Sequence, residues 1–127
     1  MPADYAYDYA IIRVVPRVER GELINVGVIL SCPARDFLEA RVAVDEGRLR
    51  AIDASLDLEA MRAHLERIPL ICRGGTAAGE LGAMPQRGRF HWLVSPRSTV
   101  IQTSPVHTGR TADPAVELQK LMEKMVG

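Results

Sequence analysis

The sequence is poor in aromatic residues, cysteines and histidines, and each shortage excludes a class of protein. Aromatic residues make up only 5% of the 127 residues, which argues against the stacking platform that binds single-stranded nucleic acid. No apolar run approaches the roughly 20 residues that a membrane span needs. Cys32 and Cys72 are the only cysteines, too few for a disulfide framework. Together with three dispersed histidines, they indicate no metal site.

The residues that are present indicate an ordinary globular protein. Apolar residues make up 47% and charged residues 25% of the chain, a balance typical of soluble proteins. The length suits a single domain, residues 1–127, with one substantial core. The first five residues lack the basic start and apolar core of a signal peptide. The sequence therefore predicts a cytoplasmic protein with no membrane partner.

Three strands are predicted in the first third of the chain. Tyr5–Val15, Leu23–Cys32 and Phe37–Val44 are rich in β-branched and apolar residues and are separated by short polar or proline-containing segments. Consecutive strands with short connections favour an antiparallel meander. Asn25 and Gly27 interrupt the second apolar run, and glycine inside a strand often marks a bulge or a close backbone approach.

Two principal helices are predicted, each after an aspartate that can cap it. Asp57 precedes an apolar stripe that runs to about Ile68, where the following proline or the apolar segment after it is expected to end the helix. Asp113 precedes the second helix, with Pro114 at its first position, where a missing N–H costs little. A short helical piece is predicted within Asp45–Ile52.

The segment between these helices predicts two further strands joined by loops. Residues 73–89 contain five glycines and a proline, which indicates a long loop, with one turn of helix as an alternative around Ala78–Met84. Arg89–Val94 and Thr99–Thr103 are the predicted fourth and fifth strands, and Ser104–Arg110 is predicted to be a polar loop. The expected fold class is therefore α+β, a mainly antiparallel sheet of about five strands covered by the two helices.

Charge is unevenly distributed, although the formal net charge is zero. Residues 36–67 carry eight acids and five arginines, whereas residues 73–112 carry five arginines and one acid, Glu80. A basic region can bind an anionic partner. The chain also has fourteen arginines against two lysines, a bias that a GC-rich genome produces without selection for binding.

An anion site is the strongest candidate site in this basic region. Arg97, His107, Thr108 and Arg110 lie just before the last helix, whose N-terminus offers free N–H groups and partial positive charge. The alternative is that these polar side chains cap turns while Asp113 alone satisfies the helix end. The first two predicted strands and their connection form a hairpin. Its residues Arg13, Arg17, Arg20 and Asn25 are also expected to contribute hydrogen-bond donors to the anion site.

Catalytic residues and cofactors are not identified by the sequence. His107 is near Ser104 and Asp113 along the chain, but a catalytic triad is defined by geometry rather than by neighbourhood. No Gly-x-Ser-x-Gly elbow is present. Whether the protein is an enzyme is therefore left open.

Several segments together resemble a known bacterial family. They are Tyr9–Leu30, with its Arg-Val-Glu-Arg-Gly-Glu and Asn-Val-Gly-Val sequences, Arg89–Leu93, Pro96–Gln102 and Ser104–Gly109. The chain is similar over nearly its whole length to the small cytoplasmic proteins grouped as domain of unknown function 3037. The resemblance implies no established activity, cofactor or functional residue. It suggests a protein partner, because genes of this family lie near genes for HipA-like kinases.

Two functions of different classes follow as hypotheses. The first is a non-enzymatic binding or adaptor module for a protein partner. The second is a small enzyme or ligand-binding domain that acts on a phosphorylated or nucleotide-like molecule through its arginines. Nucleic-acid binding ranks third, since no recognised reading motif is present. The sequence leaves a homo-oligomer open.

Overall fold

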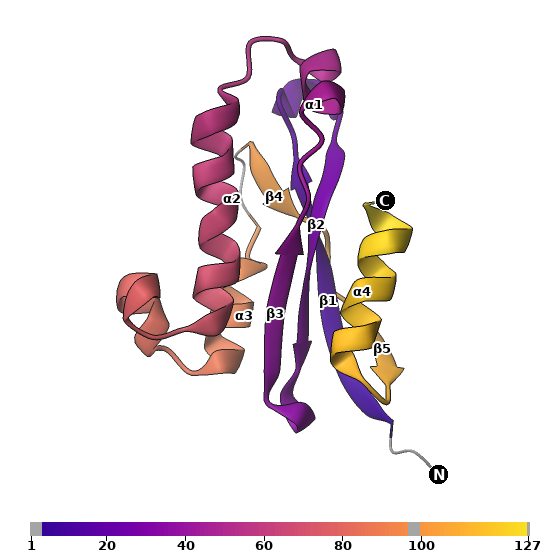
Figure 1. Ribbon diagram of the computed structural model, residues 1–127, viewed down its shortest axis with the longest axis vertical. Helices are drawn as coiled ribbons and strands as arrows, with labels where there is room; N and C mark the ends of the chain where they lie inside the picture. Colours follow the sequence, from indigo (N-terminus) through magenta and orange to yellow (C-terminus); the bar gives the residue numbers. More distant parts are fainter. Residues whose placement is uncertain (1–3, 97–99, 127) are drawn as a thin grey trace.

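A central antiparallel sheet lies between helices on both faces (Figure 1). The computed structural model describes residues 4–96 and 100–126. Helices α2 and α3 cover one face, and α4 covers the other. The strands are β1 (Tyr5–Val14), β2 (Ile24–Cys32), β3 (Phe37–Val42), β4 (Ile101–Thr103) and β5 (His107–Thr111). The helices are α1 (Glu46–Ile52), α2 (Leu58–Arg73), α3 (Gln86–Leu93) and α4 (Pro114–Met125), with 3-10 turns η1 (Val18–Arg20), η2 (Pro33–Arg35) and η3 (Thr76–Ala83).

The α+β class and the mainly antiparallel sheet predicted from the sequence are confirmed. The predicted meander is present as β1, β2 and β3, and the order across the sheet is β3-β2-β1-β4. Among the described helices, none is long and apolar enough to cross a lipid bilayer.

Strands β4 and β5 share the outer edge of β1. β4 pairs with residues 12–14 and β5 with residues 5–9. Ser104, between them, keeps the ladder continuous, because its N–H donates to the Ile11 carbonyl at 2.8 Å and its Oγ accepts from the Ile11 N–H at 2.8 Å. The predicted polar loop at Ser104–Arg110 is confirmed only for residues 104–106 and is wrong for His107–Arg110, which belong to β5. The residues of β5 are mostly polar, yet they form a strand because their backbone groups pair with β1. Pairing of this kind does not require apolar side chains.

A β-bulge in β2 divides the side chains of this strand between the two cores. Ile12 pairs with Gly27 but Arg13 pairs with Asn25, so Val26 is the extra residue. An extra residue reverses the alternation of side chains along the strand. The spacing of Ile24, Val26, Val28 and Leu30 by two residues would place all four on one face of a regular strand. With the bulge, Ile24 and Val26 join the core under α2, whereas Val28 and Leu30 join the core under α4.

Gly27 lies where the sequence predicted a bulge or a close approach, and both are present. A Cβ atom on this residue would collide with the backbone carbonyl oxygen of Arg41 on β3 and would lie 3.0 Å from the Ile12 side chain. A backbone carbonyl inside a sheet cannot move aside as a flexible side chain can. This contact restricts the position to glycine.

Helix α2 continues past its predicted end. The sequence predicted an end at Pro69 or in the apolar residues 70–72 that follow it, yet the helix runs to Arg73 with Pro69 inside it. Proline removes one helical hydrogen bond and crowds the preceding turn. Ile71 and Cys72, beyond the proline, are buried at 3% exposure. Burial of these side chains offsets that cost and keeps the last turn helical.

The predicted fourth strand, Arg89–Val94, is wrong, because these residues belong to α3 and its C-terminus. Much of the predicted loop before it is the 3-10 segment η3. Phe90 and Leu93, three residues apart, are both buried, which is the spacing of one helix face. Arg87, on the first turn, donates to Ser31 Oγ at 2.8 Å and pairs with Asp8 on β1. These contacts hold α3 on the sheet.

Helix α4 begins as predicted from the sequence. The Asp113 carboxylate accepts from Ala115 N at 3.1 Å and Val116 N at 3.3 Å, and Pro114 occupies the first turn. Leu118 and Leu121 are buried against the sheet. Capping and one apolar stripe together fix the start and the orientation of this helix.

We expect Gly27→Val to lower the free energy of unfolding by roughly 2–3 kcal/mol, because the new side chain overpacks against a backbone oxygen. The matched control is Ile29→Val on the same strand, which removes one methylene and should cost roughly 0.5–1.5 kcal/mol. Urea denaturation of both variants measures the difference. An equal or smaller loss for Gly27→Val would show that the sheet tolerates a Cβ at the bulge.

Asp113→Ala should destabilise the protein by about 1 kcal/mol, because two N–H groups at the start of α4 lose their acceptor. Asp113→Asn is the control, since an amide oxygen can accept the same hydrogen bonds. Thermal denaturation compares the two variants with the parent. A midpoint that is unchanged in Asp113→Ala would contradict the role of this cap.

Candidate functional site

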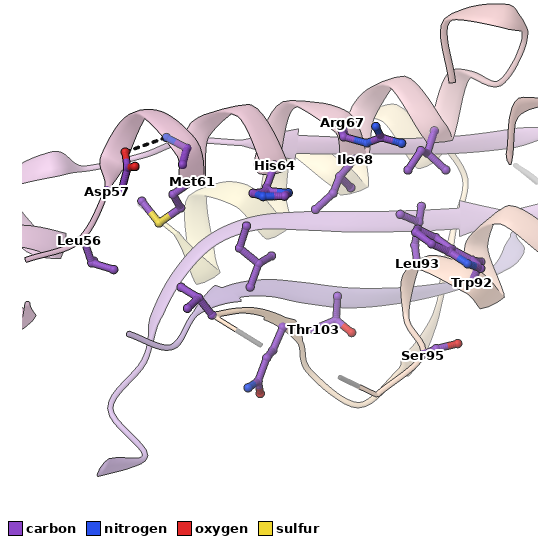
Figure 2. A pocket seen from close by; sticks show the side chains of 15 residues that line it. Leu56, Asp57, Met61, His64, Arg67, Ile68, Trp92, Leu93, Ser95 and Thr103 are labelled. Carbon is purple, nitrogen blue, oxygen red and sulfur yellow. Dashed lines mark hydrogen bonds between the residues drawn. The ribbon is translucent and has the colours of Figure 1, made fainter. Parts of the chain in front are cut away.

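A groove of about 580 Å³ runs between α2 and β4 and is closed at one end by α3 (Figure 2). It lies on the face of the sheet covered by α2. Most of its lining atoms are apolar. The lining residues are Leu56 and Asp57 just before α2, Ala60, Met61, His64, Arg67, Ile68 and Ile71 along α2, Trp92, Leu93 and Ser95 at the end of α3, and Val100 with Ile101, Gln102 and Thr103 at β4.

One stripe of α2 forms the long wall of the groove. Its lining residues recur at spacings of three and four, from Asp57 through His64 to Ile71, so they lie on one side of the helix. Figure 2 shows His64 and Ile68 on the side of α2 that faces the cavity. Leu65, outside this stripe, is fully buried. The helix thus packs on the sheet with one side and lines the groove with the adjacent one.

The opposite wall is fixed by backbone contacts with β1. The Val15 N–H donates to the Val100 carbonyl at 2.6 Å, and Ile101–Thr103 pair with residues 12–14. Val100 is 39% exposed. The Val100 side chain is therefore accessible and apolar. The backbone of this wall is held in place by its hydrogen bonds to β1.

Arg89 fixes the closed end of the groove. Its guanidinium is buried at 9% exposure and donates to the carbonyls of Ile71 at 2.9 Å, Cys72 at 2.6 Å and Met84 at 3.1 Å. A cation at the C-terminus of α2 also compensates the negative end of the helix dipole. Gly74 leaves room for the guanidinium, since a Cβ there would lie 2.7 Å from Arg89 Nη1. The result is that α3 is tied to the end of α2.

This connection places Trp92 and Leu93 at the end of the groove. Leu93 is buried, whereas Trp92 is 39% exposed. A large aromatic side chain left this accessible beside an apolar cavity is the kind of residue that anchors protein interfaces.

Polar groups in the groove are few. The Asp57 carboxylate is engaged in capping α2, where it accepts from Ala60 N at 3.0 Å. Arg67 makes no ion pair with any described residue; the ion pairs of the described region involve Arg17, Arg20, Arg62 and Arg87. Arg67 and His64 are three residues apart on α2 and both line the groove. The groove is therefore apolar with one basic position on its long wall.

Cysteine chemistry is disfavoured beside the groove. Burial raises the pKa of Cys72 to about 12, against a smaller opposing effect of the Arg89 charge. Very little of the thiol is then ionised near neutral pH. The thiolate is the nucleophile, so Cys72 packs as a small apolar side chain.

The residues predicted to form an anion site are not gathered into one cluster in the described structure. Arg97 lies outside the described residues. His107 and Arg110 are three apart on β5 and so point to opposite faces of the sheet. His107 lies against the Tyr9 ring, with centroids 5.2 Å apart, and Arg110 donates to the Asp4 carbonyl at 3.0 Å. Thr108 pairs in register with Asp8.

The start of α4 has little capacity left for an anion, since the Asp113 carboxylate occupies it. This arrangement is the alternative that the sequence analysis left open for the helix end. Among described His, Cys, Asp and Glu side chains, no group of three or more is placed to hold a metal ion.

Of the four hairpin residues proposed as contributors, Arg13 and Asn25 lie opposite each other on β1 and β2, and Arg17 and Arg20 lie in the connection between these strands. Arg17 Nε is 3.8 Å from Asp53 Oδ2, and Arg20 Nε is 2.6 Å from Glu22 Oε1, and both arginine side chains are more than half exposed. Arg13 and Asn25 face each other across the bulge, and Asn25 Nδ2 donates to the Met125 carbonyl at 3.1 Å. Arg13 Nε and Asn25 Oδ1 are buried without a hydrogen-bond partner in the described structure.

Sequence reasoning missed the groove because its parts are far apart in the chain. The α2 wall, the end of α3 and the β4 wall come from three separate segments, and α3 was predicted to be a strand. One feature of the sequence could have indicated the groove. His64, Arg67 and Ile71 recur at helical spacing beside the buried apolar stripe of α2. Trp92, the single tryptophan of the chain, was a second.

Comparison with protein-family models gives a match over most of the chain. A family model described as a protein of unknown function (DUF3037) matches residues 9–126, more than nine-tenths of the chain. No curated protein and no solved structure matches.

Arg89→Met should lower the free energy of unfolding by roughly 2–4 kcal/mol, because three backbone carbonyls at the end of α2 and before α3 lose a charged donor. Urea denaturation followed by the fluorescence of Trp92 measures this loss beside the groove itself. Arg110→Met is the matched control, since that exposed guanidinium makes one backbone contact, and its effect should stay within about 0.5 kcal/mol. Equal effects of the two substitutions would contradict the role assigned to Arg89.

Proposed function

The chain belongs to the DUF3037 family of proteins of unknown function, and we propose that this member is a non-enzymatic binding module for a protein partner. The observation that carries the proposal is the apolar groove between α2 and β4. Its accessible apolar side chains, Trp92 and Val100, lie on different walls and leave a common surface for an incoming segment. Exposed apolar surface rimmed by polar groups is typical of protein interaction sites.

The length of the groove supports a polypeptide occupant. Its lining extends from Asp57, the N-cap of α2, to Ile71, about 21 Å at the rise of an α-helix. A trough of that length offers contacts to several successive side chains of one segment. Binding would gain mainly from burying Trp92, Val100 and the apolar lining between them.

The partner we propose to test first is a HipA-like kinase encoded nearby, which the family resemblance suggests. A bacterial, cytoplasmic setting is part of the same proposal. A second copy of this chain is the other protein that the groove could bind.

The phosphate-directed alternative has less support from the geometry. Arg67 is the one arginine that lines the groove. The residues expected to bind a phosphorylated or nucleotide-like molecule lie on opposite faces of β5, in the hairpin and outside the described residues. An apolar lining with a single guanidinium suits an apolar segment better than a polyanion.

A matched pair of substitutions tests the protein-binding proposal. Val100→Glu places a charge on the wall of the groove, and Val116→Glu places the same charge on α4, where Val116 is 48% exposed. We expect Val100→Glu to weaken binding of the HipA-like kinase at least tenfold, because a carboxylate would be desolvated among apolar groups. Val116→Glu should bind as the parent does.

Affinities would be measured by calorimetry with the purified kinase, after thermal denaturation has shown that both variants fold. Capture from the native host by a photo-crosslinker at Trp92 extends the test to other partners. Loss of binding in both variants, or in neither, would count against the groove as the interaction site.

A further inference from the structure

We infer that two copies of this chain pair edge to edge through β3, about a two-fold axis at Ala40. The inference goes beyond the proposed function, because β3 and β4 end the sheet on opposite sides and the groove lies beside β4. Three properties of β3 lead to it: its open edge, the opposite charges of Glu39 and Arg41, and the small side chain between them.

The outer edge of β3 presents backbone groups that β2 does not bind. The Ala43 N–H donates to the Val26 carbonyl at 2.7 Å, and hydrogen-bonded pairs alternate along an antiparallel ladder. Residues 37, 39, 41 and 43 therefore bond to β2, whereas Leu38, Ala40 and Val42 direct their N–H and C=O groups outward. No hydrogen bond from another described residue reaches these outward groups.

An open edge is a template for a further strand. Figure 1 shows β3 with α2 on one side and α4 on the other, and no helix crosses in front of it. Gln86 Nε2 donates to the Asp36 carbonyl at 3.2 Å, just before the strand begins. The strand itself contains no proline, lysine or bulge, which are devices that protect an edge from pairing.

The two faces of β3 differ in chemistry. Leu38, Ala40 and Val42 pack against the core under α2. Glu39 and Arg41 lie exposed on the α4 face, in register with Leu30 and Val28 of the core there. A strand that adds to this edge must therefore offer apolar side chains on one face and suitably placed charges on the other.

Charge selects one register for a second copy of β3. With the axis at Ala40, Glu39 of each copy lies opposite Arg41 of the other, which gives two opposite-charge pairs. A shift of the axis by one residue keeps the backbone pairing but places Glu39 opposite Glu39, or Arg41 opposite Arg41. Opposite charges that face each other stabilise a sheet, whereas like charges destabilise it. The sequence of β3 is therefore complementary to itself in one register.

The apolar face fits the same register. Ala40 meets its own copy at the axis, where two small side chains avoid crowding, and Leu38 lies opposite Val42. Val42 is only partly buried within one chain, so Leu38 of the second copy would cover it. A two-fold contact of this kind uses the same surface on both copies and closes at two subunits.

Pairing at β3 leaves the groove accessible. Arg62 and Glu66 lie on the flank of α2 near Val42, and His64 and Arg67 lie on the flank that lines the groove. The second copy would approach the first of these flanks. A single pair of short strands makes a small interface, so we expect a dissociation constant in the micromolar range.

Exchange of charges tests the pairing. Sedimentation velocity of the full chain up to about 500 µM should show a concentration-dependent dimer. Glu39→Arg and Arg41→Glu each place like charges opposite each other and should weaken the dimer at least tenfold. An equimolar mixture of the two variants restores both opposite-charge pairs and should associate within about threefold of the parent. Damage to the fold, or loss of the Arg41 hydrogen bond to Gln119, would not be rescued by mixing.

A cysteine at the axis tests the register. Ala40→Cys should form a disulfide-linked dimer under mild oxidation, because Cα atoms of a hydrogen-bonded antiparallel pair are about 5.5 Å apart. Val42→Cys is the matched control, since Val42 lies opposite Leu38 and should not cross-link. The natural cysteines, Cys32 and Cys72, are buried.

Four outcomes would overturn the inference: a chain that stays monomeric at about 500 µM, a dimer that neither charge variant weakens, a mixture of the two variants that fails to associate, and cross-linking through Val42→Cys in place of Ala40→Cys. Val100→Glu, in the groove, should dimerise as the parent does. Loss of the dimer in Val100→Glu would place the second copy in the groove and would also overturn the inference. None of these results depends on binding of a kinase.

Discussion

The β-bulge in β2 is the constraint on which the remaining structure depends. One strand supplies side chains to two cores, and the extra residue Val26 is what turns Ile24 toward α2 and Leu30 toward α4. In a regular strand, Ile24 and Leu30 would lie on the same face of the sheet. The helix on the other face would then have less apolar surface of β2 to cover. The bulge in turn depends on Gly27, because only a residue without a side chain fits beside the Arg41 carbonyl oxygen.

The groove is a consequence of how α2 is placed on this sheet. Helix α2 packs most extensively on η3 and on β3, whereas β4 lies at the far side of β1. The space between α2 and β4 is bounded at one end by α3, which Arg89 ties to the end of α2. Such an opening exposes the stripe of α2 that includes His64 and Arg67. A binding surface therefore arises from the gap between the helical layer and the edge strand.

Local signals predicted the parts of the fold whose physical causes are local. Caps at Asp57 and Asp113 marked the starts of α2 and α4, since a carboxylate before an apolar stripe acts within one turn. The first three strands were predictable because their apolar runs are long and separated by turns. The region between α2 and α4 was predicted poorly. Alternation at Phe90 and Trp92 favoured a strand, but the Arg89 contacts, which are tertiary, favour the helix.

By itself, the sequence determined the fold class, the meander, the two capped helices and the special position of Gly27, because propensity, capping and periodicity act over a few residues. It also determined family membership. Tertiary structure alone decided that β4 and β5 share an edge, that His107 and Arg110 face opposite ways and that α2, α3 and β4 enclose a groove. These features depend on register and on contacts between distant segments, such as Arg89 with Ile71 and Ser104 with Ile11. No local pattern encodes them, since each is fixed only when the layers pack together.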